Sequence, residues 1–404
     1  MVMYKYIARD PSTGKKIRGI INAENEKSVN EYVKTRNLAL VEASISSGNN
    51  ILDKIRYRVK SKDKVIFSRQ LSTLIDAGLP LVQSLRSVLN QTKNKTLQAV
   101  VTEVINDVEG GKAFSAALAK HPNVFNPVFV SLVAAGEASG TLDVALERIA
   151  DQQEKDAELM SKVRGAMIYP VIVLLVMVAV VTFMLVSVLP QVKSLYDGIP
   201  GARLPLITTM LLAISQFIIH FWLFILIGIG VIIFFTTRWA RTLGGKSVVD
   251  SMKLKLWPIG PLFTKVYMAR FARTGTTLVA SGVPLIQVLD IVSNAVNNVH
   301  LEKSIHVATE KVRGGKSLSS SLEGDPNFLE LVPQMIKIGE DSGALEQMLD
   351  KTADYYEKEV DNQVKAISTI IEPMLMVVLG LVAIVIVAAI LLPIYGLVGQ
   401  NIIR

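Results

Sequence analysis

The sequence contains one long segment twice, and the two copies lie about 204 positions apart in its 404 residues. Residues 67–85 read FSRQLSTLIDAGLPLVQSL and residues 271–289 read FARTGTTLVASGVPLIQVL, so Phe, Arg, Thr, Leu, Gly and Pro recur in step. Further along, VEGGKAFS returns as VRGGKSLS, and GEASGTL from Gly136 returns as GEDSGAL from Gly339. A repeat of this length predicts two copies of one structural unit, and it fixes the architecture before any local pattern is considered.

Each copy runs into a long uncharged segment. Residues 165–192, 204–237 and 373–403 carry no charged side chain, and half of all residues are hydrophobic. Each window exceeds the ~20 apolar residues that a helix needs to cross a bilayer core of ~30 Å. We therefore predict an integral membrane protein. Its predicted transmembrane helices are residues 169–190, 206–235 and 371–394.

The charges predict how the spans are oriented. Residues 238–273 are rich in Lys and Arg against the single acid Asp250, whereas the loop between the first two spans holds Lys193, Asp197 and Arg203. By the positive-inside rule the basic stretch is cytoplasmic and the short loop is outside. Since the first 30 residues hold no apolar signal segment, we expect a cytoplasmic N-terminus and an outside C-terminus. The net charge of +8 also suggests nucleic-acid binding, but the cations lie beside a span, so we expect no nucleic-acid partner.

A parallel duplication explains the count of three spans. Two copies with the same surface pattern belong in the same solvent, and the segment 206–235, which has no counterpart in the repeat, returns the chain to it. This differs from the inverted repeats of many transporters.

The remaining sequence predicts three soluble modules. Residues 1–48 read as a small α+β module, with a hairpin, a helix over 26–36 capped by Asn25, a further strand and then a polar linker. Residues 63–168 and 266–370 are predicted to be homologous cytoplasmic bundles of five or six helices. In both, Gly-x-Pro indicates a helix end followed by a helix with Pro in its first turn. The predicted fold is mostly α, with two helical bundles, three transmembrane helices and the small α+β module.

Catalytic patterns are missing from the sequence. It has no cysteine, its four histidines lack metal-ligand spacing, and it has no Gly-x-Ser-x-Gly segment. Gly315-Lys316-Ser317 resembles the end of a phosphate-binding loop, but Glu310 stands where that loop needs its first Gly. We therefore expect no enzyme activity, no cofactor and no metal, and ATP hydrolysis by another protein if the process is driven by energy.

Two sets of residues are candidates for function. The first set is the doubled G-E-x-S-G motif: Gly136, Glu137, Ser139, Gly140, Gly339, Glu340, Ser342 and Gly343. One interpretation is a helix end, a turn and a new helix whose free N–H groups are capped by the Ser or the acid. The other places Glu137 and Glu340 at a contact between domains, at a partner, or at an incidental cation site.

The second set lies where the chain enters the membrane: Tyr169, Pro170, Glu372 and Pro373. A carboxylate at the threshold of a span is costly unless it is solvated or paired. Glu372 therefore either reaches the cytoplasmic headgroups or pairs with a partner's transmembrane cation. We expect Pro170 and Pro373 to bend or loosen their helices, and Pro190 and Pro393 to end two of the spans.

Together these residues resemble the inner-membrane platform proteins of type IV pilus assembly and type II secretion. The resemblance rests on the start with Tyr6, Ala8 and Asp10, the two F-x-R…G-x-P-L segments, the doubled G-E-x-S-G-x-L motif and the Tyr-Pro and Glu-Pro steps. It covers essentially the whole chain.

The resemblance implies a multi-pass protein without a cofactor of its own that associates with itself. Its implied partners are a hexameric assembly or retraction ATPase, pilin or pseudopilin subunits, other inner-membrane assembly components and the lipid bilayer. It favours a type IV pilus platform, with a type II secretion platform as the alternative. The helices over 142–189 and 345–392 would then carry motion from the bundles into the membrane. A membrane transporter and a scaffold unrelated to secretion are the remaining alternatives.

Overall fold

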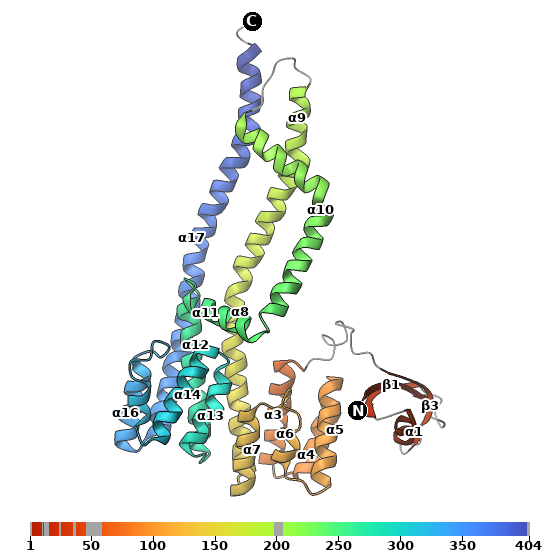
Figure 1. Cartoon of the computed structure of the whole chain (residues 1–404), viewed down its shortest axis with the longest axis vertical. Coiled ribbons are helices and arrows are strands. Elements are labelled where there is room, and N and C mark those ends of the chain that lie inside the picture. The colour runs from red at the N-terminus through yellow and green to blue at the C-terminus, as the bar shows by residue number, and fades with distance from the viewer. Residues whose placement is uncertain are drawn as a thin grey trace. The chain divides into compact units, whose positions relative to one another are not determined.

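The computed structural model describes residues 2–9, 11, 16–23, 26–34, 38–45, 59–197 and 205–401. It is dominated by helices, with three long apolar ones, and it contains two helical bundles and one small sheet (Figure 1). The predicted fold class is confirmed.

The N-terminal module is an antiparallel sheet packed on one helix. Its elements are β1 (Val2–Arg9), β2 (Lys16–Ala23), α1 (Glu26–Lys34) and β3 (Ala39–Ile45), and the strand order is β2-β1-β3. Val29 and Val33 lie one turn apart on α1 and pack with Tyr6 and Ala8 of β1, since the inward side chains of a strand alternate. The predicted cap Asn25 and the linker lie outside the described residues.

Each repeat forms a bundle of six helices within the described residues. The first contains α3 (Ser61–Asp76), α4 (Leu81–Gln91), α5 (Lys95–Glu109), α6 (Phe114–Ala119), α7 (Pro127–Ser139) and α8 (Leu142–Phe183). The second contains α12 (Gly260–Ala280), α13 (Leu285–Val296), α14 (Val299–Arg313), α15 (Leu318–Leu322), α16 (Leu331–Ser342) and α17 (Leu345–Asn401). A buried aromatic pair recurs in both cores: Phe67 with Phe125, and Phe271 with Phe328.

The Gly-x-Pro steps separate the first two helices of each bundle, with one difference from the prediction. Gly78 and Gly282 have φ of +82° and +75°, which only glycine adopts readily, and they end α3 and α12. Pro80 and Pro284 are the N-cap residues of α4 and α13. They were predicted one position further on, in the first turn, where Pro is equally tolerated because no helical N–H is lost.

Among the described residues, three helices are long and apolar enough to cross a membrane. They are Leu142–Gln191, α10 (Leu206–Trp239) and Leu345–Leu392. The first continues from α8 through a π-helical turn (Met184–Val188) into α9 (Leu189–Asp197). A further helix, α11 (Leu243–Lys255), follows α10. The predicted spans 169–190 and 206–235 lie inside the first two of these helices, and the predicted span 371–394 lies inside α17 (Leu345–Asn401).

The backbone irregularities of the spans lie away from the predicted positions. Helices α8 and α17 continue through Pro170 and Pro373, whereas α10 is kinked at Phe221, with φ −112° and ψ 16°. Helix continues beyond Pro190 and Pro393, and the prediction that these residues end two spans stays a prediction. The backbone groups that these two prolines leave without a donor are bonded from a neighbouring helix, as described below.

Candidate functional site

In each bundle the glutamate of the G-E-x-S-G motif lies at the start of a short helix, α6 in the first bundle and α15 in the second. The Glu137 carboxylate accepts hydrogen bonds from the backbone N–H groups of Phe114 and Ser115, at 2.5 and 2.9 Å, and from the Ser115 hydroxyl. Glu340 does the same at the first two residues of α15, with N–O distances of 2.6 and 3.1 Å. A carboxylate at this position satisfies first-turn donors and also complements the helix dipole.

The first glycine of the motif is required by close packing. A Cβ at Gly136 would lie 2.6 Å from the Ala145 Cβ, and a Cβ at Gly339 would lie 2.9 Å from the Leu345 Cα. Any side chain here would push α8 or α17 away from the helix before it, because real Cβ contacts this short are not tolerated.

The second glycine of the motif makes the turn between the helices. Gly140 and Gly343 have φ of +74° and +68° and cap α7 and α16 in the left-handed conformation. The Ser139 and Ser342 hydroxyls donate to carbonyls one turn earlier, at 2.8 and 2.6 Å. The capping interpretation of the motif is therefore right in kind but named the wrong helix: the acids cap α6 and α15, not the helices that follow. A role for Glu137 and Glu340 at a partner stays a prediction.

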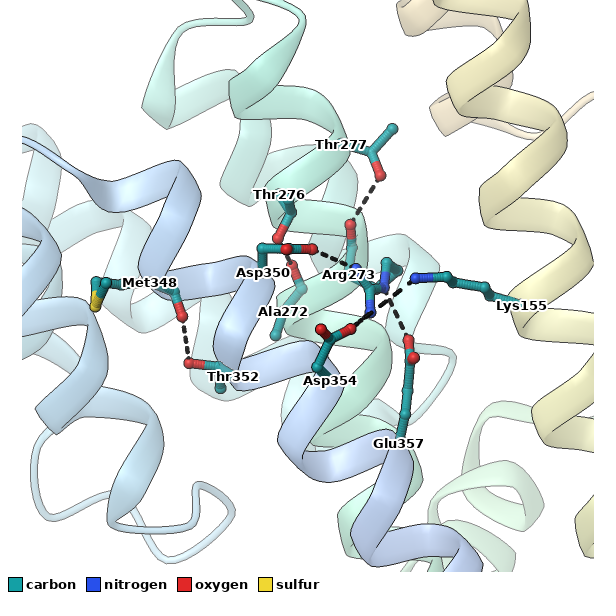
Figure 2. Close-up of polar contacts among 10 residues, drawn as sticks. All are labelled: Lys155, Ala272, Arg273, Thr276, Thr277, Met348, Asp350, Thr352, Asp354 and Glu357. Carbon is teal, nitrogen blue, oxygen red and sulfur yellow. Dashed lines mark hydrogen bonds and ion pairs between the residues drawn. The ribbon is translucent and has the colours of Figure 1, made fainter.

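An arginine from the first helix of each bundle binds acids on the last helix. We call Arg273, Asp350, Asp354 and Glu357 the Arg273 cluster (Figure 2). The guanidinium Nε lies 2.8 Å from Glu357 and Nη1 lies 2.5 Å from Asp350, while Nη2 bonds Asp354. The cluster fixes α12 to α17.

The first bundle repeats this arrangement. We call Arg69, Asp151 and Glu154 the Arg69 cluster: Arg69 donates to Glu154 at 2.7 and 2.6 Å and to Asp151 at 2.5 Å. The Arg69 side chain is 36% exposed and that of Arg273 only 10%, so the second cluster is the drier one. A signal for both was present in the sequence, because F-x-R and D-x-x-E each occur twice, but the sequence analysis did not join them.

Both clusters hold their groups in the charged state. Burial alone would lower the pKa of Arg273, but its hydrogen bonds to Glu357 and Asp354 outweigh this effect and raise the pKa. In the Arg69 cluster, the hydrogen bond from Arg69 lowers the pKa of the Glu154 carboxyl. Both shifts favour the charged forms that ion pairing needs, so the two clusters attach helices to each other.

The last helix of the first bundle also binds the second bundle. On α8, Arg148 donates to Ser281, the residue after α12, at 3.1 Å, and Gln152 donates to Thr274 of α12 at 2.9 Å. The Asp156 carboxylate accepts from Arg270 at 2.6 Å. We call these contacts and the two below the repeat seam.

The repeat seam extends to the two long helices. The Lys155 ammonium lies 4.0 Å from Asp354, a member of the Arg273 cluster (Figure 2). Lys162 donates to Asp361 of α17 at 2.9 Å, and this bond raises the pKa of Lys162. Since α8 and α17 both continue into the apolar spans, the seam couples the two membrane helices just before they leave the bundles.

Helix α10 joins the same two helices again near their far ends. The Thr208 hydroxyl donates to the Ala389 carbonyl at 3.1 Å, and the Ser215 hydroxyl donates to the Leu185 carbonyl at 2.5 Å. Ala389 lies four residues before Pro393, which has no N–H to give to that carbonyl.

In the first repeat the carbonyl that is bonded from α10 belongs to Leu185, five residues before Pro190. The backbone N–H of Leu189 bonds the Met184 carbonyl in the π-helical register, so Pro190 would be the donor to Leu185. Buried Leu212 packs in the same cluster as Leu185 and Leu189. These hydroxyls allow helix to continue past both prolines, as transmembrane helices permit when neighbours satisfy the freed groups. Their sequence alone does not indicate this role, because small hydroxyl residues are ordinary in apolar helices.

The residues predicted at the membrane boundary are exposed. Tyr169 is 54% exposed on α8, and Glu372 lies exposed on α17. In the described part of the chain no hydrogen bond or ion pair reaches the Glu372 carboxylate. These residues do not meet the G-E-x-S-G motifs, and their coupling role stays a prediction.

Comparison with known proteins decides the family. The model for "Type II secretion system (T2SS), protein F" matches residues 67–190 and 271–393, which together make up more than half of the chain. The chain belongs to the type II secretion system protein F family. Each match of the protein F domain begins at the Phe of F-x-R and ends at Pro190 or Pro393, so both arginine clusters and both freed carbonyls lie inside it.

Curated relatives extend the likeness beyond the two protein F domains. The chain is 38% identical to the type IV pilus assembly protein PilC of Thermus thermophilus over 99% of both chains. It is also 38% identical to PilC of Pseudomonas aeruginosa, over 84% of this chain and 91% of that one. It is 32% identical to the type II secretion system protein F of Xanthomonas campestris, over 98% and 99%. With three apolar helices, this family member is a multi-pass inner-membrane protein.

Proposed function

We propose that this protein is the inner-membrane platform of a type IV pilus machine, where it passes the motion of a cytoplasmic ATPase to pilin subunits in the membrane. The N-terminus would lie in the cytoplasm and the C-terminus outside, as the basic residues after α10 favour. The platform would associate with itself and with other inner-membrane assembly components.

The observation that carries the proposal is the continuity of α17. It is one helix of 57 residues from Leu345 to Asn401, about 85 Å at the rise of an α-helix. Its first turns pack in the second bundle and the rest is apolar enough to span the membrane. A movement of the bundle is therefore carried into the bilayer without a flexible joint.

We also propose that the chain has no catalytic role of its own. The arginine clusters and the repeat seam consist of groups paired with each other, and their pKa shifts favour the charged forms that pairing needs. Such sites transmit force and position helices. The energy would come from ATP hydrolysis by the partner.

The type II secretion platform is the second candidate. The named pilus relatives given above are 38% identical and the secretion relative is 32% identical, which favours the pilus system. Deleting the gene and scoring surface pili by electron microscopy and secreted proteins in the medium tests the choice. Loss of pili with normal secretion supports the proposal, whereas loss of secretion with intact pili moves the function to type II secretion.

The mechanical part of the proposal has its own test. Two glycines inserted beside Lys155 or Lys358 lengthen and soften α8 or α17 between bundle and membrane. We expect loss of surface pili while the protein still inserts in the membrane, as measured by fractionation. Two glycines inserted between Gly324 and Asp325, in the turn after α15, are the matched control and should leave pili in place. Normal piliation with the softened helices would contradict a rigid link.

A further inference from the structure

The contact between the two repeats uses different faces of the two copies. The first repeat offers α8, and the second repeat receives it on α12 and α17. If the two repeats met through equivalent faces, α17 would pack on α3 as α8 packs on α12, because α3 is the counterpart of α12. The exposure of the corresponding residues on α3 and α17 shows that this contact is not made within one chain.

The receiving face of the first repeat is open. Its residues are the first-repeat counterparts of five second-repeat residues in the seam. The counterparts of Ser281, Thr274, Arg270, Asp361 and Asp354 are Ala77, Gln70, Ile66, Glu158 and Asp151. Ile66 is 45% exposed, and the Asp151 and Glu158 side chains are 56% and 65% exposed. We call these five residues the open receiving face.

The face of α17 that corresponds to the binding face of α8 is open too. The counterparts of Arg148, Gln152, Lys155 and Lys162 are Lys351, Tyr355, Lys358 and Lys365. Tyr355 is 48% exposed, and Lys351 and Lys358 are exposed. We call these four residues the open α17 face.

The two open faces are complementary in charge. In the repeat seam, Lys155 lies by Asp354 and Lys162 bonds Asp361. The same geometry applied to the open faces brings Lys358 to Asp151 and Lys365 to Glu158, so these two pairs keep their signs, whereas the Asp156–Arg270 pair is replaced by Glu359 and Ile66 and is not repeated. It also brings the Tyr355 ring toward Gln70 and Ile66, where it would cover an exposed aliphatic side chain.

The membrane permits this repetition. Both α8 and α17 run from a bundle into an apolar span in the same chain direction. Bundles of two copies in one membrane can therefore lie on the same side of it, where the open faces are able to meet. A contact between unlike faces leaves one of each free at the ends, and further copies add until a ring closes or a row forms.

We propose that the open receiving face of the first repeat binds the open α17 face of a second copy of this chain, in the manner of the repeat seam. The contact depends on membrane insertion and not on the pilus role, so a chain that fails this test is still able to serve as a platform.

Cysteine cross-linking in membranes tests the contact, since the natural chain has no cysteine. Two chains of different size are expressed together, one with Gln70→Cys and the other with Tyr355→Cys. We expect a mixed disulfide-linked dimer on oxidation, and no dimer of either chain expressed alone. Val307→Cys, on a 48% exposed residue of α14, is the matched control and should not cross-link.

Charge reversal provides the second readout. Lys365→Glu should lower the mixed dimer about fivefold, the equivalent of ~1 kcal/mol for an exposed pair whose sign is reversed. Adding Glu158→Lys to the partner should restore it. Cross-links between identical positions would show that equivalent faces meet, and would overturn the proposal. Absence of the mixed dimer, or reversal without rescue, would overturn it as well.

Discussion

Replacing Arg273 by glutamine should loosen the second bundle far more than Arg69→Gln loosens the first. Breaking a buried ion pair costs about 3–5 kcal/mol, whereas an exposed one contributes about 0–1 kcal/mol. Arg273 is 10% exposed, but its partners Asp350 and Asp354 are about half exposed and regain water when the arginine is lost. We therefore expect about 2–3 kcal/mol for Arg273→Gln and about 1 kcal/mol or less for Arg69→Gln.

Hydrogen exchange of the full-length protein in lipid nanodiscs measures this difference. Amides of α12 and α17 exchange through local opening, so about 2–3 kcal/mol speeds their exchange about 30- to 150-fold, and 1 kcal/mol about fivefold. Arg273→Lys should fall between wild type and Arg273→Gln, because an ammonium keeps the charge without the fork that reaches three carboxylates.

Two results would refute the reasoning. Equal acceleration by the two glutamine variants would mean that burial does not set the strength of the clusters. A change of less than about fivefold for Arg273→Gln would mean that the Arg273 cluster does not fix α12 to α17.

Three further predictions follow from other contacts. Glu340→Gln keeps one acceptor oxygen for α15 but loses the charge, so the thermal midpoint of the full-length protein should fall by the equivalent of about 1 kcal/mol. Thr208→Val or Ser215→Ala leaves a carbonyl unsatisfied in the apolar layer, and each should cost about 0.6–2 kcal/mol by unfolding in bicelles. The bond from Lys265 lowers the pKa of Glu359. Its stabilisation is therefore present above the ordinary pKa of about 4.3 and is lost as pH falls through the lowered value, so Glu359→Gln should flatten the acid limb of a stability–pH curve.

Each of these predictions has a control in the chain. Glu323→Gln changes an exposed acid near α15 and should leave the midpoint in place. Thr209→Val removes an exposed hydroxyl that bonds only its own helix, so unfolding as costly as that of Thr208→Val would contradict the role of the freed carbonyl. An unchanged acid limb in Glu359→Gln would show that this ion pair does not contribute.

The architecture could be predicted from the sequence because the patterns that indicate it are local or periodic. The doubled motifs, the charge-free windows and the Gly-x-Pro steps each concern neighbouring residues, and they predicted the bundles, the spans and the helix breaks. The site depends on contacts across long separations. Glu137 caps Phe114 and Ser115, more than twenty positions earlier, and nothing in its local pattern distinguishes that helix from the one it precedes.

The continuation of helix past Pro190 and Pro393 also depends on contacts between distant residues. Local preference says that proline ends a helix, since it removes a donor. In an apolar layer the freed carbonyl needs another donor, and Thr208 and Ser215, two turns apart on α10, supply one to each repeat. Only the tertiary structure shows that these hydroxyls and carbonyls meet, so the sequence alone does not reveal how helix continues past the two prolines.

The two repeats make similar contacts within each bundle, but equivalent residues on α8 and α17 have different neighbours. This difference affects how a force on one bundle is distributed between the two helices. Lys155 of α8 approaches the Arg273 cluster, whereas its counterpart Lys358 is exposed on α17. Helices α8 and α17 are thus attached at their bundle ends by the repeat seam and near their far ends by α10. A helix attached at only one end would tilt when its bundle moves. Attached at both, α8 and α17 have to move together, so displacement of either bundle is passed to the pair of spans and not absorbed between them.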